Sequence, residues 1–258
     1  GQTTPVAGLH DNHFIFPAGS IGPDYWVYAP GNNDIQLQRY MRWLSPEGDW
    51  DFVNQLRTMR TLHSPGVMDP ILAWLAVAPL RSLISPFPTL AVLGGSGTGK
   101  TTLLSTILRQ FTGTEISLNL ASTTRFAVQG MAAAVNAFPL WFDEYRLGAA
   151  TDAKLALDQV VRDAYDGHGS VKGGMGAHWA ELKQLKSEAP LIVSGEDAFT
   201  ETSHLDRIIP IYLPASGRNP EALSTITEWG TTSFAYKWLE ILRYGLVTDS
   251  LNLKVTPL

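Results

Sequence analysis

The chain has 258 residues, of which 45% are hydrophobic and 17% are charged, and its formal net charge is −5. This composition indicates a globular protein with one large domain, or a domain with appendages, and no disordered tail is evident. The lack of cysteine excludes disulfides and cysteine-ligated zinc, and the acidic balance argues against a generally basic nucleic-acid coat.

Neither a membrane span nor a secretion signal is evident in the sequence. The longest apolar stretch, 71–80, is too short to cross a bilayer. We therefore expect a cytoplasmic protein that does not bind membranes. Because the first residue is Gly1 in place of methionine, we also expect a piece excised from a longer polypeptide.

The first part of the chain is rich in glycine, proline, asparagine and aromatic residues. Short alternating pieces at 13–16 and 25–28 predict strands between turns, and 50–59 has the pattern of a helix. We expect a small N-terminal α+β subdomain over 1–66.

A buried helix is expected next. Asp69 and Pro70 supply a cap and a first-turn proline, and the apolar pattern runs to about residue 85 with a kink at Pro79. Pro86 and Pro88 would end this helix.

From residue 89 the pattern alternates between strands and helices, which is typical of an α/β sheet. Strands are expected at 89–93, 138–142, 190–194 and 208–213, with a shorter one near 115–118, and helices at 123–136 and 153–165. The fold class that follows is α/β with a central, mostly parallel sheet, and the core would cover 67–215.

The last part of the chain, 216–258, predicts a C-terminal helical segment. Asn219 and Pro220 would open it, and an apolar stripe at helical spacing follows, made of Phe234, Trp238, Ile241 and Leu242. Core packing explains this stripe best.

The strongest functional motif is a glycine-rich loop between the first core strand and a helix-like stretch at 102–109. In such loops the backbone N–H groups surround a phosphate chain, a lysine reaches the terminal phosphates, and a hydroxyl binds magnesium. We expect Lys100 and Thr101 in the last two roles. The residues expected to bind ATP are Gly94, Gly95, Ser96, Gly97, Thr98, Gly99, Lys100, Thr101 and Thr102. This strand, loop and helix context favours a P-loop NTPase over a plain surface turn.

Two acids end the next long strand. Asp143 would hold Mg²⁺ together with Thr101, and Glu144 would polarise the attacking water. Taken without the preceding loop, this acidic segment is explained more simply by solvated carboxylates at the end of a strand.

Two further residues are candidates for catalysis. Ser194 follows an apolar strand and is expected to contact the terminal phosphate or the attacking water, with Glu196 as its competitor; an ordinary strand-to-loop turn also explains these residues. Arg207 precedes the last strand and is a candidate arginine finger that reaches into a neighbour's site. A surface salt bridge with Asp206 or Glu201 is the alternative.

A flexible glycine-rich segment with several basic residues lies between 167 and 187. Such a loop could enter a ring channel and grip a nucleic-acid backbone, and a solvated loop without a partner fits about equally well. The candidate nucleic-acid residues are Lys172, Lys183, Lys186 and His178.

Taken together, these motifs resemble the helicase-like ATPase domain of phage and plasmid primase-helicases. The shared marks are the loop at 94–102, the acidic strand at 140–144, the turn at 165–169 and Ser194 to Glu196. The segment at 203–207 is similar to the arginine-finger segment of AAA+ ATPases, a layout that superfamily 3 helicases share. A strongly basic channel motif is missing.

The resemblance implies a ring, expected to be a homo-hexamer, that uses ATP and Mg²⁺ to move on single-stranded DNA. A primase or polymerase domain on the same polypeptide would be a partner. The alternative is an ATP-gated oligomeric switch or assembly ATPase that never translocates. A small-molecule kinase is a third option, against which Glu144 and Arg207 both argue.

Overall fold

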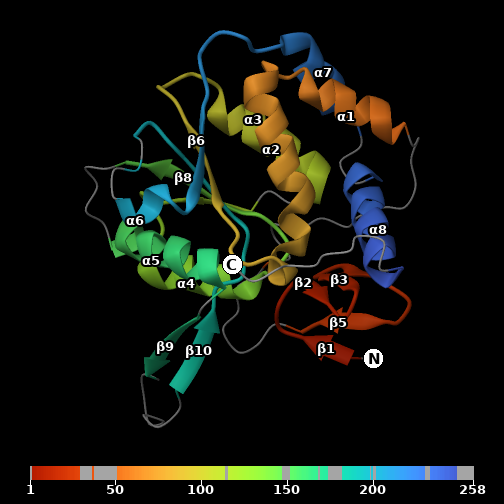
Figure 1. Ribbon diagram of the computed structural model, residues 1–258, viewed down its shortest axis with the longest axis vertical. Helices are drawn as coiled ribbons and strands as arrows, with labels where there is room; N and C mark the ends of the chain where they lie inside the picture. The colour runs from red at the N-terminus through yellow and green to blue at the C-terminus, as the bar shows by residue number, and fades with distance from the viewer. Residues whose placement is uncertain are drawn as a thin grey trace.

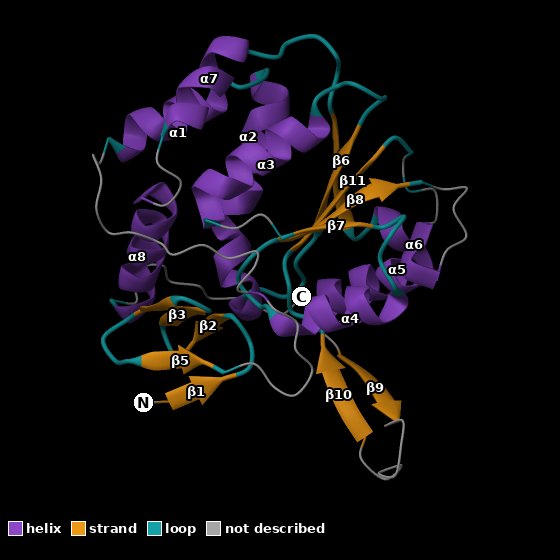
Figure 2. Cartoon of the chain, turned by 180° about the vertical axis from the view of Figure 1, so that it is seen from behind, coloured by secondary structure: helices purple, strands orange, loops and turns teal. Residues whose placement is uncertain are grey.

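The computed structural model describes residues 2–29, 37, 51–113, 116–146, 152–167, 169–173, 182–197, 199, 202–229 and 233–248. A five-stranded parallel sheet forms its centre, with strand order β12, β6, β11, β8, β7 (Figures 1 and 2). The strands are β6 (Thr89–Leu93), β7 (Ser117–Asn119), β8 (Leu140–Tyr145), β11 (Leu191–Gly195) and β12 (Ile208–Tyr212). This arrangement confirms the expected α/β class with a mostly parallel sheet.

Helices cover both faces of this sheet, which is why β6 and β11 are buried along their whole length. One apolar core packs Ala91 and Leu93 against α4 and α5, and a second packs Leu90 and Val92 against α2 and α3. The helices are α1 (Phe52–Arg60), α2 (Pro65–Val77), α3 (Lys100–Thr112), α4 (Arg125–Ala134), α5 (Asp152–Asp166), α6 (Thr202–Leu205), α7 (Pro220–Glu228) and α8 (Ser233–Val247), with a 3-10 helix η2 (Ala78–Leu83) after α2.

The N-terminal residues form small sheets at one end of the molecule (Figure 2). Their strands are β1 (Gln2–Thr4), β2 (Gly8–His10), β3 (His13–Phe16), β4 (Gly19–Ile21) and β5 (Trp26–Tyr28). The side chain of Asn136 joins this part to the core, because it accepts a 2.7 Å hydrogen bond from Leu9 N and donates one of 3.1 Å to Leu9 O. The boundary at residue 66 stays a prediction.

The structure corrects the expected start of the buried helix. The helix α2 begins at Pro65, and Pro70 lies inside it. Asp69 does not cap the helix, because it lies inside α2, whose N-cap is Ser64. Both of its carboxylate oxygens accept hydrogen bonds from Arg60, at 2.5 and 2.8 Å. The kink expected at Pro79 is a change from α-helix to 3-10 helix at Ala78.

The run Pro65–Leu83 is long and apolar enough, by length and composition alone, to cross a membrane. More than half of it, 56%, is buried inside the fold. The core of a globular domain contains helices of this kind, and here the run packs against the sheet and α3.

Most other core elements lie within three residues of their expected positions. The end of β8 has consequences for function, because the strand extends to Tyr145 and both acids belong to it. The C-terminal segment contains two described helices, α7 and α8. On α8, Phe234 and Leu242 are buried as expected, whereas Ile241 is 41% exposed.

The glycine-rich segment after α5 differs from the expected loop. Its described parts, β9 (Gly169–Gly173) and β10 (Leu182–Lys186), pair as an antiparallel ribbon that projects from the body of the molecule (Figures 1 and 2). Lys172 and Lys183 are directly opposite each other in its register.

Candidate functional site

The loop between β6 and α3 needs glycine at defined positions. Gly97 and Gly99 have φ angles of +73° and +86°, a region that favours glycine, and Gly99 is the N-cap of α3. A side chain at Gly94 would place Cβ 2.6 Å from the carbonyl oxygen of Leu213. The loop therefore turns tightly and leads directly into the amino end of the helix, where backbone N–H groups lack helical partners.

The side chain of Lys100 bends back over this loop. Its ammonium group donates hydrogen bonds of 2.7 Å to Gly94 O and 2.9 Å to Gly95 O. A positive charge is thus held beside the amino end of α3, where the helix dipole is positive as well. This combination favours an anionic ligand.

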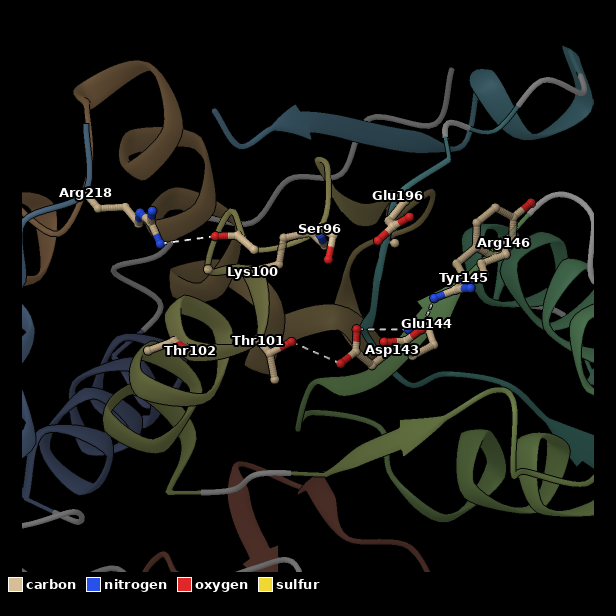
Figure 3. Close-up of a pocket in the computed structure, with 13 residues that line it drawn as sticks. Ser96, Lys100, Thr101, Thr102, Asp143, Glu144, Tyr145, Arg146, Glu196 and Arg218 are labelled. Atoms are coloured by element: carbon tan, nitrogen blue, oxygen red, sulfur yellow. Dashed lines mark hydrogen bonds and ion pairs between the residues drawn. The ribbon is translucent and has the colours of Figure 1, made fainter. Parts of the chain in front are cut away.

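The acidic pair of β8 lies opposite the start of α3. Thr101 Oγ1 donates a 3.3 Å hydrogen bond to Asp143 Oδ2, and the residues belong to separate elements 42 positions apart (Figure 3). Asp143 Oδ1 accepts from Ser194 Oγ at 2.6 Å and from the backbone N of Glu144 at 2.9 Å. Each oxygen of this carboxylate therefore has a separate set of partners.

A local irregularity shapes the end of β8. Glu144 has φ +64°, in the left-handed region that non-glycine residues seldom adopt, and the pairing of β11 with β8 shifts register between Val193 and Gly195. A Cβ on Gly195 would lie 2.2 Å from the carbonyl oxygen of Tyr145. Glycine at 195 lets the strands approach here, and the unusual backbone of Glu144 sets the position of its side chain.

These elements surround one cavity of about 370 Å³, a volume in the range of small-molecule sites (Figure 3). Glu144 Oε2 lies 3.0 Å from Arg146 Nη2, so acidic and basic groups meet at the same rim. The lining residues are Ser96, Gly97, Gly99, Lys100, Thr101, Thr102, Asp143, Glu144, Tyr145, Arg146, Gly195, Glu196 and Arg218. The loop after β6 and the acids of β8 thus face the same space.

Of the residues expected to bind nucleotide, Ser96, Gly97, Gly99, Lys100, Thr101 and Thr102 line this cavity. Thr98 is buried, and its hydroxyl donates a 3.0 Å hydrogen bond to Gly95 O. Gly94 is close to Leu213, as described above. Thr98 and Gly94 therefore shape the loop without lining the cavity.

Ser194 requires a correction. Its side chain is fully buried, does not line the cavity, and donates its hydroxyl hydrogen to Asp143. A direct contact with phosphate therefore finds no support in its placement. Glu196, which the sequence offered as the competitor, lines the cavity.

Arg207 lies far from this cavity in its own chain. It precedes β12, whose pairing with β6 runs from Ile208 opposite Thr89 to Tyr212 opposite Leu93. Arg207 is therefore at the amino edge of the sheet and the loop is at the carboxyl edge, about 13 Å or more away along the strands. The guanidinium carbon lies 5.5 Å from the ring centre of Tyr165.

The candidate nucleic-acid residues fall on or near the β9–β10 ribbon. Lys172 and Lys183 belong to its paired strands, and Lys186 at its end forms an ion pair with Glu188. His178 lies outside the described residues.

Sequence reasoning missed Arg218. It precedes α7, and its Nη1 atom donates a 3.2 Å hydrogen bond to Gly97 O. A turn that contains Gly217 precedes it and the cap of α7 follows it, so no local pattern indicates that it returns to the loop.

A second cavity of about 470 Å³ adjoins the first. The two share Gly99, Thr102 and Arg218. The further lining residues of the second are Leu62, His63, Thr98, Leu103, Leu213, Ala215, Gly217, Asn219, Pro220 and Leu223. Its walls are more apolar than those of the first cavity.

A scan of the sequence against protein-family models finds no match, and a search of curated proteins finds none either. Among solved structures, an active helicase, SCCmec type IV Cch, matches with a TM-score of 0.53 and 15% identity over 98% of this chain and 48% of that chain. The apo A form of the NrS-1 C-terminal region matches with a TM-score of 0.46 and 14% identity over 93% of this chain and 54% of that chain. The JCV helicase matches with a TM-score of 0.43 and 16% identity over 80% of this chain and 62% of that chain.

The chain spans about half the length of the Cch helicase. At this identity the likeness concerns the fold alone. The chain therefore has a helicase-like α/β fold, and its central sheet with flanking helices is shared with that protein.

Proposed function

We propose that this chain is a Mg²⁺-dependent ATPase, the motor domain of a replicative DNA helicase from a phage or mobile element. The observation that carries the proposal is the contact between Thr101 and Asp143. It brings the glycine loop and the acidic strand, far apart in sequence, to one cavity. Had they faced different cavities, a phosphate loop and a metal-binding acid could not have acted on the same ligand.

The residues of the cavity fit a nucleoside triphosphate with magnesium. Lys100 and the amino end of α3 would bind the phosphates, and Thr101 with Asp143 would hold the cation. Magnesium prefers oxygen ligands, commonly one or two protein groups completed by water and phosphate oxygens. When bound, the cation would neutralise charge on the phosphate chain.

Glu144 is the proposed base that orients and polarises the attacking water. Its carboxylate lines the cavity beside Asp143 and is held by Arg146 at 3.0 Å. A carboxylate can accept the proton that leaves water as the new oxygen bond to the terminal phosphorus forms and the bond to the bridging oxygen breaks, releasing ADP and phosphate. Glu196, which also lines the cavity, takes the place of Ser194 as the candidate for contact with the terminal phosphate or the attacking water.

The adjoining cavity supports the proposal, because it would take the nucleoside. It offers apolar walls, among them Leu62, Leu103 and Leu223, which suit a base and sugar with few polar contacts. Gly99 and Arg218 line both spaces, so a ligand with its phosphates in the first cavity could extend into the second.

A ring, a homo-hexamer in our proposal, would explain the position of Arg207. An arginine at the amino edge of the sheet cannot serve the nucleotide of its own chain, whereas a neighbour packed against that edge could receive it. The same ring would bring the projecting β9–β10 ribbons together.

Single-stranded DNA is the proposed partner of the β9–β10 ribbon. Lys172 and Lys183 face each other in the register, and like charges directly opposite destabilise an antiparallel pair. A phosphate backbone would offset this cost by neutralising both charges. A primase or polymerase domain on the same polypeptide and a cytoplasmic location complete the proposal.

A steady-state ATPase assay with and without single-stranded DNA tests the proposal. We expect Mg²⁺-dependent hydrolysis that DNA stimulates severalfold, and hydrolysis lost in Lys100→Ala. Hydrolysis without any DNA response would favour the ATP-gated switch. Sizing of the wild-type chain with and without a non-hydrolysable ATP analogue shows its assembly state. Absence of both nucleotide binding and ATP hydrolysis in the wild-type chain would exclude both functions.

A further inference from the structure

A chain of two hydrogen bonds leads from the buried side chain of Trp141 to Asp143 of the acidic pair. The indole Nε1 of Trp141 donates a 2.7 Å hydrogen bond to Ser194 Oγ, and Ser194 Oγ donates one of 2.6 Å to Asp143 Oδ1. Trp141 is 2% exposed and Ser194 is fully buried, so the bond between them is shielded from water, whereas Asp143 at the end of the chain lines the cavity.

The direction of this chain is fixed by chemistry. An indole N–H can only donate, so the hydroxyl oxygen of Ser194 must accept from it. The single hydroxyl hydrogen is then directed to Asp143, whose ionised carboxylate can only accept. A hydroxyl without the indole could rotate, whereas here its donor direction is set by a large, immobile ring.

The fold explains why the indole is immobile. Trp141 and Asp143 are two residues apart on β8 and therefore share one face of the sheet. On that face Trp141 packs in the apolar core with Val92, Leu104 and Ile107. Rotation of its ring would require this core to open.

The consequence is a carboxylate whose two oxygens are kept distinct. Oδ1 accepts from Ser194 and from the backbone of Glu144, which leaves Oδ2 beside Thr101 at the cavity. Groups that orient a metal-binding carboxylate in this way raise metal affinity, because the ligand need not be ordered when the ion binds.

We propose that Trp141 is a positioning residue that acts through Ser194 to orient Asp143 for Mg²⁺. The inference rests on the proposed function, since it assigns a task only in a Mg²⁺-nucleotide site. It also gives Ser194 a role that its burial allows. Trp141 does not line the cavity, so it would touch neither nucleotide nor metal.

The test compares two buried tryptophans. Trp141→Phe removes the indole donor and keeps an aromatic ring, and Ser194→Ala breaks the same chain at its second link. Trp74→Phe is the matched control, because Trp74 is 4% exposed and donates a 2.8 Å hydrogen bond to Pro88 O, away from the cavity. Binding of ATPγS is measured at increasing MgCl₂ and in EDTA.

We expect Trp141→Phe and Ser194→Ala each to raise the half-saturating Mg²⁺ concentration about tenfold, the lower end of the effect of such outer-shell groups. Metal-free ATPγS affinity should change less than about twofold, and the double variant should show little more than either single one, since both remove one chain. Trp74→Phe should lower the melting temperature without changing the Mg²⁺ requirement.

Two outcomes overturn the inference alone. One is an unchanged Mg²⁺ requirement in both Trp141→Phe and Ser194→Ala, and the other is an equal shift in Trp74→Phe, which would indicate general loosening of the core. A wild-type chain that binds ATPγS without any dependence on Mg²⁺ would instead contradict the proposed function, and this inference with it.

Discussion

Arg218 and Gly97 are 121 residues apart in sequence, and the guanidinium of the first donates a 3.2 Å hydrogen bond to the carbonyl oxygen of the second. The side chain of Arg218 also lies within 3.3 Å of the position that a Cβ on Gly99 would take. The segment before α7 thus supports the glycine loop and brings a further positive charge to it.

We predict that Arg218→Ala weakens ATP binding about tenfold, because a hydrogen bond from a charged donor contributes about 1.5–3 kcal/mol and exposure at this site reduces it. Calorimetric titration with ATPγS measures the change. Arg57→Ala, which alters an exposed arginine on α1, is the control. Equal affinity in Arg218→Ala and the wild type would contradict a role at the loop.

Glu144→Gln should retain ATP affinity and lose turnover by a factor of about 10²–10⁴, the usual contribution of a positioned acid or base. The amide keeps the size of the side chain but cannot accept the proton from water. Comparison of kcat and nucleotide affinity between the variants separates the roles. Glu196→Gln, on the same cavity, should lose less than about tenfold. Normal hydrolysis by Glu144→Gln would exclude it as the base.

Arg207 should act on a neighbouring chain. Arg207→Ala and Lys100→Ala should each be nearly inactive alone, because one lacks the finger and the other the phosphate contact. Mixed together they should regain part of the activity, since some interfaces then combine an intact finger with an intact loop. If the mixture is no more active than its components, the role in trans is wrong.

The β9–β10 ribbon should govern the affinity for DNA. Lys172→Ala and Lys183→Ala should each weaken binding of a single-stranded oligonucleotide and reduce the slope of log affinity against log salt by about 0.7, the value for one lost phosphate contact. Fluorescence anisotropy at several salt concentrations measures both. Lys237→Ala, on α8, is the control, because that lysine pairs with Glu240. If the slope of log affinity against log salt is unchanged in both variants, the ribbon does not contact the DNA.

Gly195→Ala should destabilise the fold by about 1–3 kcal/mol, as overpacking of a tight site does. The new Cβ would lie 2.2 Å from Tyr145 O, and both strands would have to shift. Urea unfolding measures the effect. Gly66→Ala is the matched control, since a Cβ there would meet no atom within 4 Å beyond its chain neighbours and its own helix backbone, and alanine favours a helix by about 0.5–1 kcal/mol. A neutral Gly195→Ala would show that the strands tolerate separation.

The sequence by itself determined the local elements of the core. The apolar run at 89–93, the glycines after it and the helical pattern beyond them are short-range features, and local backbone preferences and periodicity are enough to place them. The same reasoning failed at Asp69, because α2 begins at Pro65 and encloses that residue, whose side chain pairs with Arg60 of another helix. It also failed at the β9–β10 ribbon, because no local sequence pattern predicts the pairing of these two strands.

Only the tertiary structure decided which side chains share the cavity and which stand behind it. Ser194 and Glu196 are two residues apart and both polar, yet the strand pairing buries Ser194 against Asp143 and leaves Glu196 on the cavity wall. Arg218 reaches Gly97 because β12 lies beside β6 and delivers the following turn to the loop. Such contacts depend on the order and register of strands, and these are set by the packing of the whole sheet.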